Sequence, residues 1–101
     1  MITNKLKIKT LSQSFLYTDY YCEFVKYKNK KFKIIVKPDR NRIEAHIYLL
    51  TNNGLCEIAT GSDFKYNIRD FDIDDTTSKN KKGEFINKQL KYAKEFITLI
   101  F

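Results

Sequence analysis

The fold of this chain is decided by residues 20–37, which read YYCEFVKYKNKKFKIIVK. Apolar and polar side chains alternate over residues 20–28 and again over 31–37, and a period of two residues is typical of a β-strand with one buried face. Asn29-Lys30 stands between the two runs and provides a short turn. We therefore expect these residues to form a β-hairpin.

The alternation also predicts how the two strands of this hairpin pair. A register that sets Tyr27 opposite Phe32 and Val25 opposite Ile34 gathers the large apolar side chains on one face. A slip by one residue would set Val25 opposite Lys33 and would turn every side chain to the other face. We therefore expect one apolar face, which belongs to the core, and one face rich in lysine.

The alternating pattern continues on both sides of the hairpin. Residues 42–50 read as a third strand with the same core face. Residues 55–60 read as a fourth strand, which follows Asn53-Gly54, the strongest signal for a two-residue turn in the chain. Shorter alternating stretches at residues 5–10 and 64–73 are candidates for one further strand each. The first is also compatible with a loose arm, and the second with an extended crossing segment.

The C-terminal stretch, residues 83–100, has the period of an amphipathic helix. Its apolar side chains fall within one half of a helical wheel, and Gln89 is the one polar residue among them. A sheet alone would leave its apolar face in water, so we expect the helix to cover that face. The predicted fold is therefore α+β, a four- to six-stranded antiparallel meander sheet covered on one face by a single C-terminal α-helix.

Length and composition indicate one domain over residues 1–101. Hydrophobic residues make up 43% of the chain and aromatic residues 15%, which is enough for a packed core, and no linker or repeat divides the sequence. Cys22 and Cys56 are too few for a disulfide framework or a cysteine metal cluster, so we expect reduced and buried thiols. No stretch resembles a signal peptide or a membrane span, and we expect a cytoplasmic protein without membrane contact.

The charge of the chain is informative only through its placement. A net charge of +7, from 19 Lys+Arg against 12 Asp+Glu, attracts polyanions if the cations gather on one face. Only three of the 19 are arginine, and A·T-rich codon usage produces the same lysine-rich composition without selection for charge. The face opposite the predicted core carries the candidate binding residues, which are Lys26, Lys28, Lys31, Lys33, Lys37, Arg42, Phe24, Tyr48 and His46.

This face leads to a first hypothesis, a small non-enzymatic protein that binds nucleic acid with little sequence specificity. The predicted register sets Lys26 opposite Lys33 and Lys28 opposite Lys31, and such pairs repel each other unless an anion lies between them. Lysine contacts phosphate as a point charge, and a ring such as that of Phe24 stacks on bases. The expected partner is then nucleic acid, bound without a cofactor.

A second hypothesis belongs to another class of protein. Small lysine-rich and asparagine-rich domains without catalytic motifs include inhibitors, immunity proteins and anti-defence proteins of mobile elements, which is an analogy of size and composition alone. Such a protein would dock on an acidic protein surface through the apolar positions Ile35, Leu50 and Leu55 and through the apolar C-terminal end.

Motifs for metal binding and catalysis are weak in this sequence. His46 is the only histidine, which excludes sites that need two, and we expect it beside Lys33. The acidic segment Asp70–Asp75 begins like a calcium loop but lacks the glycine and the final glutamate of that loop. Pro38-Asp39 with Asp63-Phe64-Lys65 resembles the Pro-Asp…(Asp/Glu)-x-Lys motif of a nuclease superfamily, and this resemblance implies a metal-dependent nuclease as a third alternative. Because the flanking helices of that family are missing, we expect no enzyme activity, no metal and no cofactor.

Overall fold

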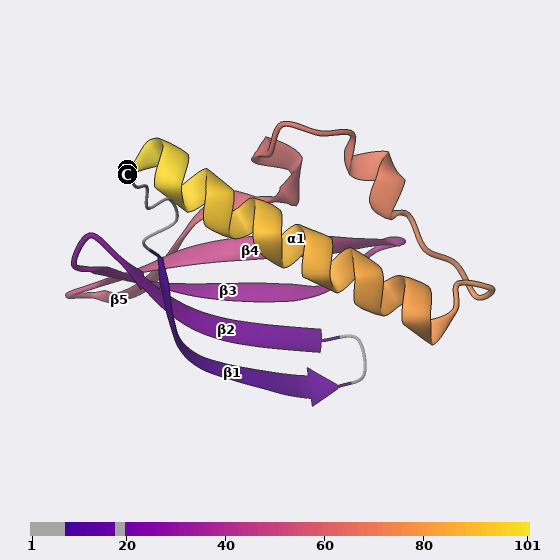
Figure 1. Cartoon of the computed structure of the whole chain (residues 1–101), viewed down its shortest axis with the longest axis horizontal. Helices are drawn as coiled ribbons and strands as arrows, with labels where there is room; N and C mark the ends of the chain where they lie inside the picture. The colour runs from indigo at the N-terminus through magenta and orange to yellow at the C-terminus, as the bar shows by residue number, and fades with distance from the viewer. Residues whose placement is uncertain (1–7, 18–19) are drawn as a thin grey trace, which may run out of the picture.

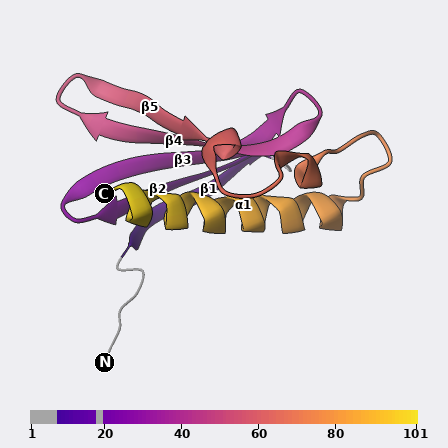
Figure 2. The same ribbon diagram turned by 90° about the horizontal axis from the view of Figure 1, so that it is seen from above.

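Five strands and one long helix make up the fold. In a computed structural model, which describes residues 8–17 and 20–101, the strands form one antiparallel sheet in the order β1-β2-β3-β4-β5. The helix covers one face of this sheet and crosses it obliquely, so the molecule has two layers (Figures 1 and 2). The α+β meander under a C-terminal helix is thus confirmed. The elements are β1 (Lys9–Tyr17), β2 (Tyr20–Tyr27), β3 (Lys30–Asp39), β4 (Arg42–Thr51), β5 (Gly54–Thr60), the 3₁₀ turns η1 (Gly61–Asp63) and η2 (Ile68–Phe71), and α1 (Lys79–Ile100).

The register of the β2–β3 hairpin differs from the prediction by two residues. Val25 pairs with Phe32, and not with Ile34, so the predicted pairing is wrong. The turn is Lys28-Asn29, whose φ angles of 50° and 64° fit a two-residue hairpin loop with both central residues in the left-handed region. Such a loop matches the twist of the strands. The predicted faces survive, because a shift by two residues leaves every side chain on the same side of the sheet.

The core lies between α1 and the sheet. Side chains from β2, β3 and β4 that alternate with the lysines are enclosed, and α1 contributes its apolar side. Rings from the segment between η1 and α1 complete the core on the β4 side, where Tyr66 stacks on Tyr92 with ring centroids 4.8 Å apart. The largest fully enclosed apolar side chains are Phe32, Ile34, Ile43, Ile47, Ile97, Val25 and Val36.

Strand β1 is placed differently from the prediction of a strand at residues 5–10. It spans Lys9–Tyr17, so only its first two residues overlap with that prediction, and residues 5–7 lie outside the described part. A shift in the register between Thr10 and Ser12 leaves Leu11 as a bulge. The side chains of this edge strand at residues 9–15 are exposed, and the sequence carries no apolar alternation there.

The prediction of a strand at residues 64–73 is wrong. This segment holds the 3₁₀ turn η2, and an isolated bridge between Arg42 and Asp72 takes the place of a strand ladder to the sheet. The crossing alternative is nearer to the structure. The helix also begins earlier than residue 83: α1 starts at Lys79, because the Ser78 hydroxyl oxygen accepts a hydrogen bond from the Lys81 N–H group at 3.1 Å. Its polar first turn shows no apolar period, so only this cap marks the start.

Gln89, the one polar residue on the apolar side of α1, is fully buried and has a structural role. Strand β5 ends at Thr60, opposite His46, so the N–H group of Ala45 has no partner in the sheet. The Gln89 side-chain oxygen accepts a hydrogen bond from that N–H group at 2.9 Å, and the Gln89 side-chain nitrogen donates to the Tyr66 hydroxyl. Gln89 therefore satisfies a buried backbone group that would otherwise be unpaired.

Gly61 makes this arrangement possible, and a substitution there is expected to disturb it. A methyl group on Gly61 would lie 2.8 Å from the Gln89 side-chain oxygen and 2.9 Å from the Glu44 Cγ. We expect Gly61→Ala to lower the free energy of unfolding by about 1–3 kcal/mol in urea titrations, because the enclosed neighbours must shift. Gly83→Ala is the matched control, because nothing lies within 4 Å of a methyl group in that helical position. It should instead stabilise the protein by about 0.5–1 kcal/mol.

The two cysteines differ in their exposure to solvent. Cys22 is buried, as expected, but Cys56 is exposed because β5 is an edge strand, and both are free thiols. Burial raises the pKa of the Cys22 thiol.

Among the residues that the structure describes, no helix has both the length and the apolar character needed to cross a membrane.

Candidate functional site: the lysine face

The sheet face opposite α1 carries a row of lysines across three neighbouring strands. The register sets Lys9 on β1 opposite Lys26 on β2, and Lys26 opposite Lys31 on β3. Neighbouring strands lie about 4.8 Å apart, so three ammonium groups on long stems share one strip of surface. We use the name lysine face for this row together with three residues from the same side of β2 and β3, so that it consists of Lys9, Lys26, Lys31, Lys33, Lys37 and Phe24.

Aromatic rings lie under two of these lysines. The Lys33 Nζ lies 5.6 Å from the centroid of the Phe24 ring, which is its direct cross-strand partner. The Lys37 Nζ lies 5.8 Å from the centroid of the Tyr20 ring. Both distances suit a cation–π contact, which keeps the ammonium groups close to the sheet. Phe24 is half-buried, so one side of its ring is reached only when Lys33 moves.

Within the described residues, no ion pair joins a carboxylate to a lysine of the lysine face, although Lys37 lies directly opposite Glu44 on β4. In the described ranges 8–17 and 20–101, the ion pairs involve other residues, and none of the five lysines takes part in one. The row of Lys9, Lys26 and Lys31 therefore carries positive charge that no ion pair in the described part of the chain compensates. Like charges set directly opposite each other destabilise a sheet slightly, and water or a bound anion relieves this repulsion.

Lys28 does not belong to the lysine face. It is a turn residue, and its Nζ donates a hydrogen bond to the backbone carbonyl oxygen of Phe101 at 3.2 Å. Its ammonium group also lies 5.3 Å from the centroid of the Tyr27 ring. A cation in this place complements the negative end of the α1 dipole. The predicted pair of Lys28 with Lys31 is therefore wrong, and Lys26 is the residue opposite Lys31.

Arg42 and Tyr48 lie next to the lysine face and are engaged with acidic neighbours. The Arg42 Nε lies 3.4 Å from an Asp72 carboxylate oxygen. Tyr48 lies opposite Lys33 on one side and opposite Glu57 on the other. Burial, with a smaller contribution from the charge of Glu57, raises the pKa of the Tyr48 hydroxyl. The hydroxyl is therefore protonated at neutral pH and is available as a hydrogen-bond donor.

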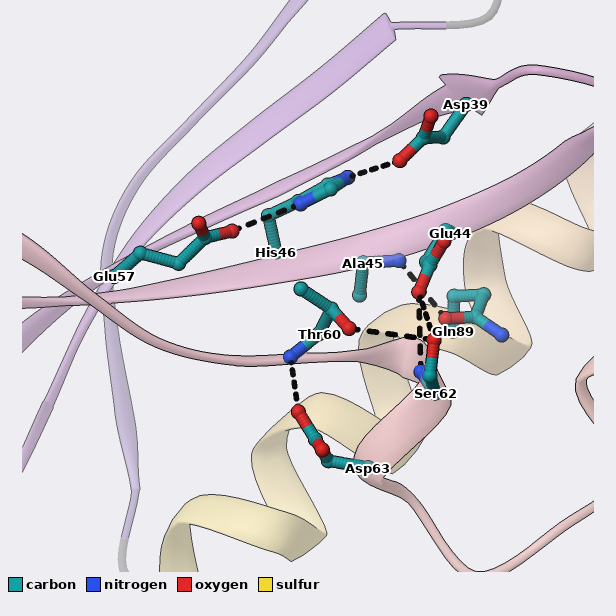
Figure 3. Close-up of polar contacts among 9 residues, drawn as sticks. All are labelled: Asp39, Glu44, Ala45, His46, Glu57, Thr60, Ser62, Asp63 and Gln89. Carbon is teal, nitrogen blue, oxygen red and sulfur yellow. Dashed lines mark hydrogen bonds and ion pairs between the residues drawn. The ribbon is translucent and has the colours of Figure 1, made fainter.

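His46 lies among carboxylates rather than beside Lys33. Its cross-strand neighbours are Ile35 and Thr60. The Nδ1 atom lies 3.0 Å from a Glu57 carboxylate oxygen, and the Nε2 atom lies 3.5 Å from an Asp39 carboxylate oxygen (Figure 3). The sheet face thus changes sign, from lysines over β1 to β3 to carboxylates around His46 near the end of β5.

The residues that resemble a nuclease motif are not brought together. Asp63 accepts a hydrogen bond from the Thr60 N–H group at 2.9 Å and so caps the turn η1, whereas Asp39 lies beside His46. Figure 3 shows the two carboxylates well separated, with the ribbon of β4 between them. Asp63 and Lys65 line a groove beside the last turns of α1, and Asp39 lines a different hollow together with Arg42. The resemblance therefore defines no common site.

Sequence reasoning missed Glu23, the most enclosed carboxylate of the described residues. Its side chain is 0% exposed and lies on the core side of β2. The Lys94 Nζ on α1 lies 2.6 Å from one carboxylate oxygen, and Thr10, Gln13 and Tyr21 donate hydrogen bonds to the carboxylate at 2.7, 3.1 and 2.5 Å. Burial acts to raise the pKa of Glu23, but the hydrogen bonds from these four donors outweigh it and lower the pKa.

The alternation of apolar and polar residues in β2 already places Glu23 on the core face of the sheet. A charged residue at a core position of β2 requires a charged partner, and Lys94 lies on the helix that covers that face. This cluster ties β1, β2 and α1 together. It is buried and saturated with hydrogen bonds, so its role is in stability rather than in binding.

An apolar groove lies on the helix side of the molecule. It has a volume of about 420 Å³ and is lined by Phe64, Tyr66, Phe96 and the last turn of α1. Leu99 is 71% exposed at its rim. Leu50 and Leu55, which pair next to the β4–β5 turn, are exposed as well. Leu11 and Phe15 on β1 are also exposed, so apolar surface is present on three parts of the described chain.

Comparisons of the chain with protein-family models, with curated proteins and with solved structures found no match.

Proposed function

We propose that this chain is a non-enzymatic binding protein that uses the lysine face to bind nucleic acid, single-stranded or without sequence preference. The observation that supports the proposal most is the row of Lys9, Lys26 and Lys31, which lie opposite one another on three adjacent strands. Uncompensated cations in such a row gain free energy when phosphates replace the counterions around them.

The chemistry of the side chains favours binding without base recognition. Lysine contacts phosphate as a point charge, whereas sequence is read mainly by arginine, asparagine and glutamine. The nearby arginine, Arg42, is engaged by Asp72. Phe24 is the ring within the lysine face that a base would contact, and stacking on a ring contributes about 1–3 kcal/mol per base without regard to its identity.

The dependence of binding on salt tests this proposal. If all five lysines contact phosphates, the logarithm of the binding constant for single-stranded DNA falls with the logarithm of the salt concentration with a slope of about −3.5, because each contact contributes about 0.7. Fluorescence anisotropy with a labelled oligonucleotide at several salt concentrations measures this slope. A slope near zero, or no binding at low salt, would rule the proposal out.

A second candidate function, docking on another protein as an inhibitor or immunity protein, is favoured by the apolar groove and by exposed Leu50, Leu55 and Leu99. Lysine is depleted in the centre of protein interfaces, so this function would use these apolar patches rather than the lysine face. A partner captured equally well with and without nuclease treatment, and still captured after the charges of the lysine face are reversed, would favour this second function.

A further inference from the structure

The residues around His46 form a cluster of three groups that commonly bind metal ions. One ligand atom each from Asp39, Glu44 and His46 lie within 4.8 Å of one another. Two of these residues come from β4 and point to the same side of the sheet, and Asp39 comes from the end of β3, beside the turn to β4. A first-row metal ion with bonds of about 2.0–2.2 Å keeps its ligand atoms within about 4.4 Å. Asp39, whose side chain is 41% exposed, is free to adjust its position to a bound ion.

Within this cluster, the Nε2 atom of His46 lies closest to Asp39, at 3.5 Å from a carboxylate oxygen. It is enclosed, with the side chain 11% exposed, and it has no hydrogen-bond partner in the described part of the chain. The Glu57 carboxylate can only accept, so the Nδ1 atom, 3.0 Å away, carries a proton and donates it. In the neutral ring the Nε2 lone pair then faces the oxygens of Asp39 and Glu44. A cation bound between these three electron-rich atoms would relieve their mutual repulsion.

The surroundings of the cluster match those of histidine metal sites. A histidine that binds a metal through one nitrogen usually donates its other N–H group to a carboxylate, which fixes the ring, and Glu57 occupies that place. Glu44 is also oriented, because one of its oxygens accepts hydrogen bonds from the Ser62 N–H and hydroxyl groups at 3.0 and 2.8 Å (Figure 3). A polar hollow of about 350 Å³ is lined by Asp39 and Glu44 together with Arg40 and Arg42, so solvent reaches the two carboxylates from this side.

We propose that Asp39, Glu44 and His46 bind a divalent first-row transition-metal ion, with Glu57 as the group that orients His46. One imidazole and two carboxylates suit Zn²⁺ or Mn²⁺, whereas Mg²⁺ and Ca²⁺ prefer oxygen alone. This site is separate from the lysine face, and the proposal does not depend on nucleic-acid binding.

The single histidine makes a direct test possible. In ¹H–¹⁵N spectra, the imidazole signals of the whole chain come from His46. Titration with Zn²⁺ is expected to shift the Nε2 signal, to leave Nδ1 protonated and to saturate at one equivalent. Mn²⁺ is expected to broaden the backbone signals around Asp39, Glu44 and His46 first. Imidazole signals that stay unchanged at millimolar Zn²⁺ would overturn the proposal.

Variants separate this site from adventitious binding. Because Cys56 is an exposed thiol next to Glu57, the Zn²⁺ affinity is measured by calorimetry in a Cys56→Ser background. In that background, Asp39→Asn and Glu57→Gln are each expected to weaken binding about 10-fold to 100-fold, whereas Asp75→Asn, in the exposed loop before α1, should have no effect. Circular dichroism confirms that each variant is folded. Equal affinity in Asp39→Asn and Asp75→Asn, or loss of binding in Cys56→Ser alone, would contradict the proposal.

Discussion

Reversing three charges on the lysine face is expected to abolish binding to single-stranded DNA. In the variant Lys26→Glu/Lys31→Glu/Lys33→Glu, three phosphate contacts are lost and three carboxylates repel the backbone. We expect the affinity at low salt to fall roughly 100-fold or more, and the remaining salt slope to be shallower by about 2. Fluorescence anisotropy with the same oligonucleotide measures both quantities. Because these three lysines are exposed or half-buried, the triple variant should still fold, and a thermal melt checks that it does.

A control with the same change in net charge distinguishes the lysine face from general attraction. Lys79, Lys88 and Lys91 are exposed on α1, on the other side of the molecule. When both triple variants are compared at about 0.15 M salt, where the Debye length is about 8 Å, Lys79→Glu/Lys88→Glu/Lys91→Glu is expected to lose less than about 5-fold in affinity, because its charges are screened from the lysine face. If both triple variants lose affinity equally, binding follows net charge alone and the lysine face is not a site.

Removing the buried charge of Glu23 is expected to destabilise the protein more than either Gly61→Ala or the loss of a surface ion pair. Glu23→Gln leaves the Lys94 ammonium group, whose side chain is 20% exposed, without its counter-charge, and it places an amide N–H₂ group against several donors. Breaking a buried ion pair in this way costs about 3–5 kcal/mol, which is a large part of the stability of a domain of this size. Urea unfolding followed by circular dichroism measures the change.

Glu84→Gln is the matched control for Glu23→Gln. Glu84 pairs with Lys81 at 3.8 Å on the surface of α1, with both side chains more than half exposed, and its loss should change stability by no more than about 0.5 kcal/mol. In the double variant Glu23→Gln/Lys94→Met, part of the lost stability should return, because no unpaired charge remains. A cost below about 1 kcal/mol for Glu23→Gln would show that the cluster does not depend on charge.

The same carboxylate is expected to make stability depend on pH. The pKa of Glu23 is lowered in the folded protein, so its stabilising contribution is complete above the unfolded value of about 4.3 and is lost as the pH falls through the folded value. The free energy of unfolding should therefore decrease in acid below about pH 4, and it should decrease less steeply in Glu23→Gln. Parallel pH profiles for the two proteins would contradict this assignment.

The fold was predictable from the sequence wherever one face of an element is buried and the other is not. The alternation in β2, β3 and β4 indicated the sheet and its faces, and the apolar half of α1 indicated the helix. Elements without that contrast were missed. Strand β1 is exposed at the edge of the sheet, and the first turn of α1 is polar, so neither has a period to detect. The hairpin register was wrong because the apolar pattern does not distinguish shifts by two residues.

The candidate sites were predictable only in part, for a related reason. Face assignments depend on parity, so Lys26, Lys31, Lys33 and Lys37 were placed correctly on one side of the sheet. Contacts depend on register and on distant segments. Lys28 was misplaced because the turn begins one residue earlier, and the approach of Asp39 and Glu57 to His46 requires the β3–β4 and β4–β5 pairings together.

Nuclear magnetic resonance mapping tests the central claim most directly. When a short single-stranded oligonucleotide is added to ¹⁵N-labelled protein at low salt, the account predicts that the largest shifts fall on the backbone signals of β1, β2 and β3 near Lys9, Lys26, Lys31 and Lys33. These shifts should vanish on addition of salt. Shifts centred instead on the apolar groove near Phe96 and Leu99, or no shifts at all, would contradict the assignment of nucleic-acid binding to the lysine face.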